Sequence, residues 1–402
     1  MRKHAHVVVV GGGILGCGVA AELAGRGAAV VLVERGQIAA GASGRNHGLI
    51  FKPEHPQLGG LAHASAEIYR ELATRTALDL SLDEAPRGLV IAVAEESQWP
   101  AAAREATAAA RVGTSTQRLD EAGLRELEPA LAPGLLGGFL IEDGIRIDPA
   151  ALTLAFAEEA RAAGAEVLTH TEVKQVLVRK GRVQGVATDD GIVAAATVVN
   201  AAGPWAARLA RTAQADVPGV PIAGIRGWLL LTDARPGLLA HLVESAGWHL
   251  APEDPGPGRA TVGLLAGGCA TGWRDIGSLI QQNRGGHILL GGSRAGSLTD
   301  EPEGAEVVGE IARRAAALVP ALADIPVTSA WSGVRPTSPD GLPLIGWVPG
   351  IDGLFLAGGH GGQGVTLGGG SARLAAQMML GEAPFEDPAP FDPIRFAAGS
   401  VG

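Results

Sequence analysis

The chain has 402 residues, of which 47% are hydrophobic and 18% charged, and its formal net charge is −10 at pH 7. A chain of this length favours two domains over a single core. The acidic balance and the absence of a Lys/Arg run argue against a nucleic-acid partner. Two cysteines, Cys17 and Cys269, without a C-x-x-C pair argue against an iron–sulfur cluster or a cysteine-held zinc. We therefore expect no metal site, and we expect a reducing, cytoplasmic environment.

Residues 1–21 are first basic and then apolar, and in this they resemble a secretory signal peptide. A cofactor motif accounts for the same residues better, so we reject that interpretation. Elsewhere the sequence has no run of about eighteen apolar residues, and we expect no membrane span.

Residues 6–35 predict a strand, a turn, a helix and a second strand. The two strands are the apolar runs Val7–Val10 and Val30–Val33. Between the strands, the glycines at G-x-G-x-x-G spacing are Gly11, Gly13 and Gly16. In order, they permit a tight turn, the approach of the backbone to a pyrophosphate and close packing of the helix on the strand. The helix N-terminus that follows offers free N–H groups to phosphate. The second strand ends in Glu34, placed to accept from a ribose hydroxyl, so the segment predicts a dinucleotide site.

This fingerprint does not by itself distinguish NAD from FAD. The short polar stretch that follows, residues 35–50, contains Ser43, Arg45 and Asn46. These side chains can supply hydrogen-bond donors to phosphate and to the edge of a flavin ring.

Four stretches, in order along the chain, resemble the D-amino-acid oxidase superfamily of flavoproteins, in its glycine oxidase and sarcosine oxidase branch. They are GASGRNHG at 41–48, ATVVNAAGPWA at 196–206, SGVRPTSPDGLPLIG at 332–346 and LFLAGGHGGQGVTLGGGSARL at 354–374. The resemblance implies an α/β fold with a Rossmann-type FAD-binding domain assembled from discontinuous segments. It also implies a substrate domain built on a mixed or antiparallel sheet with helices.

We assign residues 1–80, 144–212 and 326–402 to the FAD-binding domain, and residues 81–143 and 213–325 to the substrate-binding domain. We expect Asp148 to cap a helix that begins at Pro149. The stretch 245–277 contains helix breakers and no helical period, and we interpret it as a loop or insertion over the site.

The glycine-rich segment 358–370 lies between an apolar strand and a helix. In the family that it resembles, this segment runs along the pyrimidine edge of the flavin, where side chains would block the ring. Backbone N–H groups at a helix N-terminus there would stabilise negative charge on the reduced flavin. The FAD contacts that the resemblance implies are Gly11, Gly13, Ile14, Gly16, Glu34, Arg35, Ser43, Arg45, Asn46, His47, Gly48, Leu49, Val173, Ala202, Gly203, Trp205, Arg335, Gly361, Gly362, Gln363, Gly364, Val365 and Thr366.

The FAD is expected to be non-covalent. The histidine that attaches FAD in some relatives aligns with Arg45, and no cysteine follows residue 269.

The resemblance implies hydride transfer from a CH–NH group to flavin N5, which gives an imine. A carboxylate-bearing substrate needs a buried cation, and the planar fork of arginine gives two parallel hydrogen bonds. Arg335 is our candidate, at the position of the carboxylate-binding arginine of the glycine oxidase branch. A salt bridge to Asp340 is the alternative interpretation of Arg335, and Arg45 and Arg294 are weaker candidates.

His47 lies in the flavin loop, and we weigh a flavin or substrate contact against plain loop packing. His360 is interpreted as positioning its loop rather than as a base. The tyrosines that close over substrate in glycine and D-amino-acid oxidases have no equivalent here. Other side chains are candidates to line the pocket instead: Trp228, Trp248, His249 and Gln281.

The predicted function is FAD-dependent oxidation of a small amino or imino acid. The alternatives are oxidation of a 2-hydroxy acid, a flavin subunit that passes electrons to partner subunits, and a plain NAD-dependent dehydrogenase. The strand at 280–296 resembles beta subunits of opine and D-hydroxyproline dehydrogenases, which keeps electron-accepting partners open. A homo-oligomer is compatible with the sequence.

Overall fold

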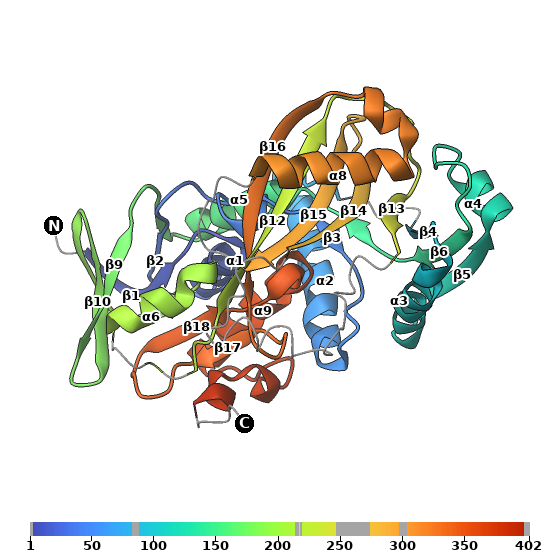
Figure 1. Ribbon diagram of the computed structural model, residues 1–402. Helices are drawn as coiled ribbons and strands as arrows, with labels where there is room; N and C mark the ends of the chain where they lie inside the picture. Colours follow the sequence, from blue (N-terminus) through green and yellow to red (C-terminus); the bar gives the residue numbers. More distant parts are fainter. Residues whose placement is uncertain are drawn as a thin grey trace.

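The computed structural model describes residues 3–82, 88–213, 217, 219–246, 274–296 and 304–397. Two eight-stranded sheets, a small two-stranded sheet and their helices make up this part of the chain (Figure 1). Trp248, His249, Cys269 and most of the predicted insertion lie outside the described residues. Among the described residues, no helix combines the length and the apolar character that crossing a bilayer requires.

The first sheet has a parallel centre in which β1 lies between β11 and β2. Its valine-rich strands are buried on both faces, as the continuous apolar runs predict. The strand order is β17 (Leu344–Trp347), β18 (Leu354–Gly358), β11 (Gly191–Asn200), β1 (Lys3–Val10), β2 (Val30–Val33) and β8 (Glu166–Leu168); β10 (Arg182–Thr188) also pairs with β11, and β9 (Val173–Arg179) pairs with β10.

The side chains of β1 alternate between two cores, because successive strand residues point to opposite faces. Val7 and Val9 pack on the side of α1 (Ile14–Gly25), α2 (Gly59–Arg75), α5 (Pro149–Ala162) and α9 (Gly364–Leu380). Val8 and Val10 pack on the side of α6 (Ala206–Ala213). The predicted start of α5 is confirmed: Asp148 accepts from the N–H groups of Ala150 and Ala151.

The second sheet is mixed, as predicted, and α8 (Gly304–Leu318) crosses one of its faces (Figure 1). Leu230, Ile280 and Leu290 of the sheet pack there with Ile311 and Ala315 of the helix. The strand order is β16 (Val327–Thr337), β12 (Ala223–Thr232), β15 (Ile288–Gly296), β14 (Arg274–Gln282), β13 (Leu242–Ser245), β4 (Leu89–Val93), β6 (Gly137–Glu142) and β5 (Ser115–Asp120). A small third sheet pairs β3 (Leu49–Ile50) with β7 (Ile145–Arg146).

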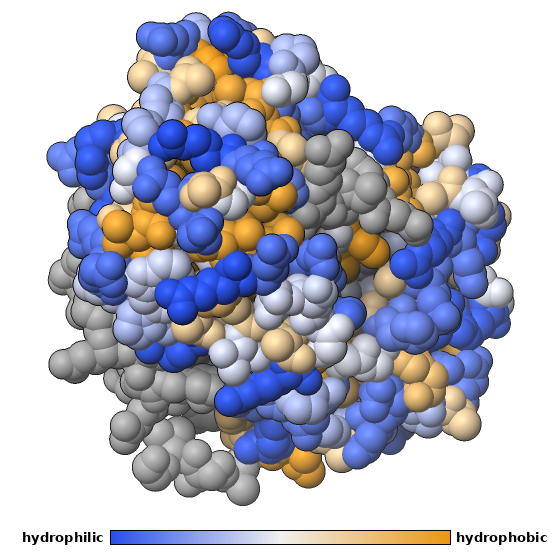
Figure 2. Space-filling view, turned by 90° about the vertical axis from the view of Figure 1, so that its right-hand side faces the viewer, coloured by the Kyte–Doolittle hydropathy of each residue, from blue (hydrophilic) through white to orange (hydrophobic). Residues whose placement is uncertain are grey.

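The far end of the second sheet carries α3 (Trp99–Arg111) and α4 (Glu121–Leu127), at the right of Figure 1. Ala101, Ala102 and Ala106 of α3 are buried, and the rest of that helix is more exposed. Figure 2 shows this side of the molecule, where hydrophilic residues cover much of the surface and hydrophobic residues form patches between them.

Strand β16 joins the two sheets. It pairs with β12 along nearly its whole length, although its residues fall in the range that we assigned to the FAD-binding domain. At its end, Thr337 forms a bridge with His360, which follows β18 of the first sheet. The strand therefore places Arg335 where the two sheets meet. The division of the chain into two domains stays a proposal.

The glycine run at 368–370 lies inside α9, where glycine ordinarily costs helix stability. A Cβ at Gly370 would collide with the backbone of Leu61, and one at Gly369 would lie 2.9 Å from the ring of Tyr69. At Gly368 it would lie 3.1 Å from the side chain of Ile14. These glycines therefore let α9 pack closely against α2 and α1.

Tyr69 of α2 links this helix to α9 through its hydroxyl. The hydroxyl donates to Val365 O of α9 at 2.7 Å and accepts from Gly369 N of α9 at 3.0 Å. The ring is fully buried. We expect Tyr69→Phe to lower the free energy of unfolding by about 1–3 kcal/mol, because it leaves two buried backbone groups without this partner.

Urea denaturation of Tyr69→Phe checks this expectation. Thr107→Val is the control, because the Thr107 hydroxyl donates to a backbone carbonyl on an exposed helix surface. That control should stay within about 0.5 kcal/mol of the unchanged protein. Equal effects of the two substitutions would contradict the role of Tyr69.

Candidate functional site

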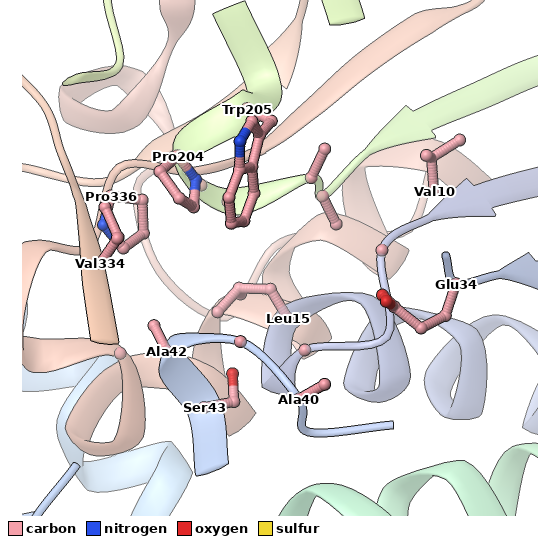
Figure 3. A pocket seen from close by; sticks show the side chains of 18 of the residues that line it. Val10, Leu15, Glu34, Ala40, Ala42, Ser43, Pro204, Trp205, Val334 and Pro336 are labelled. Atoms are coloured by element: carbon pink, nitrogen blue, oxygen red, sulfur yellow. The ribbon is translucent and has the colours of Figure 1, made fainter. Parts of the chain in front are cut away.

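A cavity of about 510 Å³ lies at the carboxyl ends of the central parallel strands β1, β2, β11 and β18. Figure 3 shows its walls: Leu15, Ala42 and Ser43 on one side, and Pro204 and Trp205 on the other. Ligands of open α/β sheets bind at this edge. The cavity is lined by most of the predicted FAD contacts: Gly11, Gly13, Ile14, Glu34, Arg35, Ser43, Arg45, Asn46, Val173, Ala202, Gly203, Trp205, Arg335, Gly361, Gly362, Gly364 and Val365.

Six predicted contacts do not line this cavity: Gly16, His47, Gly48, Leu49, Gln363 and Thr366. A Cβ at Gly16 would collide with the carbonyl oxygen of Gly11, so Gly16 serves helix packing. Gly11 itself has φ +116°, and a Cβ there would collide with the carbonyl of Ala201. The turn is therefore shaped for close backbone packing.

Two polar side chains organise the glycine turn. Glu34 accepts from Gly12 N at 2.6 Å with one oxygen and from Gly36 N at 2.7 Å with the other. Its remaining lone pairs are available to hydroxyl donors. Ser43 Oγ accepts from Ile14 N at 2.9 Å, at the start of α1, which leaves its own proton to donate. This arrangement suits a ribose beside Glu34 and a phosphate beside Ser43.

Arg35 and Trp205 meet across the crevice. Arg35 follows β2, and Trp205 lies in a short helix, η4 (Gly203–Trp205), that follows β11. The strand β1 lies between β2 and β11. The guanidinium carbon of Arg35 lies 3.7 Å from the centroid of the Trp205 ring, which is cation–π geometry. This contact connects the two walls of the cavity.

The opposite end of the cavity is formed by η6 (Gly361–Gln363) and the start of α9. A Cβ at Gly362 would project into open space, so glycine leaves room there. His360 is 3% exposed, and its Nε2 is hydrogen-bonded to Ser371 Oγ at 2.9 Å. Burial lowers the pKa of His360 to about 4, with an opposing hydrogen bond to the Gly358 backbone. The ring is therefore neutral at neutral pH.

Arg335 lines the cavity from β16 as a part-buried cation. Its Nη1 donates to Ser293 O at 3.2 Å, and no carboxylate of the described residues pairs with it. Burial, and then the charge of Arg294, lowers the pKa of Arg335 to about 10, so it remains charged at neutral pH. The alternative interpretation, a salt bridge between Arg335 and Asp340, is wrong, because Asp340 pairs with Arg395 at 2.7 Å.

Arg45 also lines the cavity and donates to Ser332 O at 2.9 Å. Arg45 and Arg335 thus approach the same region from the loop and from β16. Arg45 is exposed, whereas Arg335 is part-buried.

His47 contacts the second sheet rather than the cavity. Its Nδ1 lies 3.0 Å from Oε1 of Gln281, and its Nε2 is buried against Gly291 without a hydrogen-bond partner in the described part of the chain. Burial lowers the pKa of His47 to about 4; the hydrogen bond to Gln281 opposes this, and the charge of Arg335 adds to it. A neutral imidazole therefore connects the loop to the sheet.

Trp228 does not line the cavity, contrary to its candidacy as a pocket residue. It points to the α8 side of the second sheet, where a Cβ at Gly304 would lie 2.6 Å from its ring. Gly227 and Ser293, which contact Arg335, were missed by sequence reasoning. The only signal for Gly227 is an isolated glycine within a predicted strand, which often marks a close approach.

The parallel sheet, glycine turn and cavity define a dinucleotide-binding protein. Comparisons with known proteins narrow this class. The DAO family of FAD-dependent oxidoreductases matches residues 6–378. A glycine oxidase of Pseudomonas aeruginosa is 32% identical over 397 residues, which cover 96% of this chain and 98% of that protein.

A crystal structure of glycine oxidase from Geobacillus kaustophilus superposes with a TM-score of 0.82 at 27% identity, and the match covers 100% of both chains. One subunit of the anaerobic glycerol-3-phosphate dehydrogenase of Escherichia coli is 34% identical over 239 residues, 57% of this chain and 42% of that one. The chain belongs to the DAO family of FAD-dependent oxidoreductases.

The cavity fits the cofactor of this family. The turn at Gly11 and Gly13 carries no side chains, Glu34 has free lone pairs, and Gly362 leaves open space at the far end. These features are what a ribose, a pyrophosphate and a flat ring require of their surroundings.

We expect the contact between Arg35 and Trp205 to slow release of FAD. Arg35→Met removes a cation–π contact worth roughly 0.5–2 kcal/mol, so the dissociation rate should rise about 2- to 30-fold. The measurement is the increase in flavin fluorescence after dilution of the holoenzyme.

Arg118→Met is the matched control, because Arg118 lies 4.4 Å over the ring of Trp99, and neither residue lines the cavity. Its FAD release should be unchanged. Unchanged release from Arg35→Met would contradict a role for this contact.

A second expectation concerns acid stability. Native His360 stays neutral down to a pKa of about 4, whereas an unfolded histidine takes a proton near 6.5. The unfolded state therefore binds more protons between these values, and stability falls as pH falls from about 6.5 to 4. The contribution of His360 to this loss is about 3 kcal/mol.

Unfolding free energies of His360→Asn measured from pH 7 to pH 4 should fall less steeply than those of the unchanged protein. The same substitution at His63, whose side chain is 77% exposed, should leave the slope unchanged. Parallel curves for all three proteins would show that His360 does not titrate as expected.

Proposed function

We propose that this chain oxidises the CH–NH bond of a small amino or imino acid, with Arg335 as the anchor for the substrate carboxylate. The observation that carries the anchor assignment is a part-buried guanidinium at the cavity with no carboxylate partner among the described residues. A buried cation without an opposite charge is costly, and a bound carboxylate would satisfy it.

Arg335 keeps hydrogen-bonding capacity for this task. A guanidinium has five N–H donors, and the described contacts of Arg335 use Nη1 for a single bond to Ser293 O. The remaining donors can bind both oxygens of a carboxylate in parallel. Holding the carboxylate fixes the neighbouring carbon relative to the ring of the cofactor, which is the main contribution that a protein makes to such a reaction.

FAD, when bound, supplies the acceptor for the hydride that leaves the substrate carbon. We propose that it is held without a covalent bond: Glu34 would hold the ribose, Ser43 and the start of α1 the pyrophosphate, and η6 with the start of α9 the far edge of the ring. Water hydrolyses the released imine to a carbonyl compound and an amine or ammonia, and an electron acceptor must reoxidise the flavin before the next turnover.

We propose that neither His360 nor His47 acts as the base. Burial lowers the pKa of each imidazole to about 4, which makes both weak proton acceptors, and His47 does not line the cavity. We propose that His360 positions the loop before α9, and that the substrate amine arrives without its extra proton.

The similarity to glycine oxidases over nearly the whole chain favours an amine over a 2-hydroxy acid as the substrate. The electron acceptor is a separate question, since one partial relative belongs to a larger dehydrogenase. We propose that the acceptor is either oxygen or a second protein of such a complex, and that the protein works in the cytoplasm, which its two cysteines support.

An anaerobic absorbance titration of the holoenzyme tests the reaction. The panel contains D- and L-amino acids, N-methyl glycines, prolines, opines and 2-hydroxy acids. Bleaching of the flavin by an amine-bearing acid is expected, and admission of air then reports on oxygen as the acceptor. Bleaching by hydroxy acids alone would overturn the proposed substrate class.

Arg335→Ala tests the anchor. We expect FAD binding to be retained and KM for the bleaching substrate to rise at least 100-fold, because a charged hydrogen-bonding partner of the carboxylate is removed. Arg313→Ala is the control, since Arg313 lies on an exposed helix surface, paired with Glu310. Steady-state kinetics measure both variants, and an unchanged KM in Arg335→Ala would overturn the anchor assignment.

A further inference from the structure

One face of the second sheet carries three glycines where it meets Arg335 and the loop 45–47. Gly227 of β12 is paired with Gly333 of β16, and Leu229, two residues further along β12, is paired with Gly291 of β15. Residues two apart on a strand, and residues opposite each other on paired strands, point to the same face. The missing side chains therefore belong to a single surface.

Each of these glycines contacts a different polar residue. A Cβ at Gly227 would collide with Nη1 of Arg335. At Gly291 it would lie 2.7 Å from Nε2 of His47, and at Gly333 it would lie 3.2 Å from Cβ of Arg45. The surface is thus in van der Waals contact with the candidate anchor and with the loop.

The contact at Gly227 determines how Arg335 lies. Arg335 belongs to the outer strand β16, while its hydrogen-bond acceptor, Ser293 O, belongs to β15 on the far side of β12. The guanidinium must cross β12 to reach that carbonyl, and Gly227 is the residue it crosses. The ideal Cβ position at Gly227 also lies only 2.7 Å from Ser293 O, in the same narrow space.

An irregularity in the sheet leaves Ser293 O accessible. The pairing of β12 with β15 shifts register between Arg226 and Leu229, so the regular ladder is interrupted beside Gly227. At this interruption Ser293 Oγ accepts from Trp228 N at 2.9 Å, while Ser293 O accepts from Arg335. A β-bulge of this kind redirects side chains and frees backbone groups from pairing.

We propose that Gly227 is a positioning residue for the reaction: its lack of a side chain lets the Arg335 guanidinium lie across β12 on Ser293 O, and this fixes the direction in which Arg335 presents its remaining donors to a substrate carboxylate. The proposal rests on Arg335 as the anchor, which belongs to the proposed function. A methyl group at position 227 lifts the guanidinium from the sheet and misdirects the donors.

The test is binding of acetate, a simple carboxylate, to the holoenzyme, followed by the change in the visible absorbance of the flavin. Gly227→Ala should raise Kd for acetate at least tenfold and raise KM for the amine substrate to a similar extent. The FAD content should be unchanged, and kcat should change less than KM, because the substituted residue acts through Arg335.

Gly346→Ala is the matched control. Gly346 is also a crowded strand glycine, with a Cβ position 2.7 Å from Cδ of Pro393, but it belongs to β17 and does not line the cavity. It should lower the thermal unfolding midpoint to a similar extent and leave the acetate Kd within twofold. Equal acetate Kd values for the two variants would show that crowding alone, rather than Arg335, explains any effect.

A second pair of variants keeps the proposal falsifiable if Gly227→Ala is poorly stable. Lysine lacks the guanidinium nitrogens that collide with a methyl group at position 227. Arg335→Lys alone should therefore weaken acetate binding at least tenfold relative to the unsubstituted protein. Added to Gly227→Ala, it should weaken binding less than twofold relative to Gly227→Ala alone. Equal losses in the two backgrounds would overturn the proposal.

The Arg335→Ala variant separates the two levels of the argument. If Arg335→Ala binds acetate normally, the anchor itself is wrong, and the proposed function loses its carboxylate site. If Arg335→Ala loses acetate and Gly227→Ala does not, only the role of Gly227 is overturned.

Discussion

Close approach between backbones is the constraint on which this structure depends. At the first turn, Gly16 lies against the carbonyl of Gly11, and Gly11 lies against the carbonyl of Ala201, so β1, α1 and β11 meet with no side chains between them. At the other end of the chain, Gly369 and Gly370 let α9 lie against α2. Both contacts fix helix N-termini at the carboxyl edge of the central sheet, where N–H groups and positive dipole ends attract phosphate and other negative charge.

The second sheet repeats this use of glycine for a different purpose. There the missing side chains make room for polar groups, with Arg335 across Gly227 and His47 against Gly291. Burial keeps His47 neutral, while Arg335 stays charged although burial lowers its pKa. A part-buried, charged Arg335 at the cavity and a neutral His47 beside the loop thus both rest on positions where the sheet has no side chain.

Much of the fold was predictable from the sequence because the signals are local. The valine runs predicted β1 and β2, and Asp148 with Pro149 predicted the start of α5. The glycine spacing and Glu34 predicted the dinucleotide crevice. The position of β16 was not predictable, since pairing with β12 depends on partners about a hundred residues away. For the same reason, Trp228 could not be assigned to the α8 side from its own neighbours.

The sequence by itself determined the class of cofactor site, the family and a candidate anchor for a substrate carboxylate. It could do so because glycine spacing, apolar strand segments and ordered motifs are patterns of residues that lie next to one another in the chain. The tertiary structure decided what surrounds that anchor. Asp340 pairs with Arg395 and leaves Arg335 to Ser293, and Gly227 provides the space that Arg335 crosses. These relations join residues far apart in the chain, and side-chain packing, rather than any local preference, determines them.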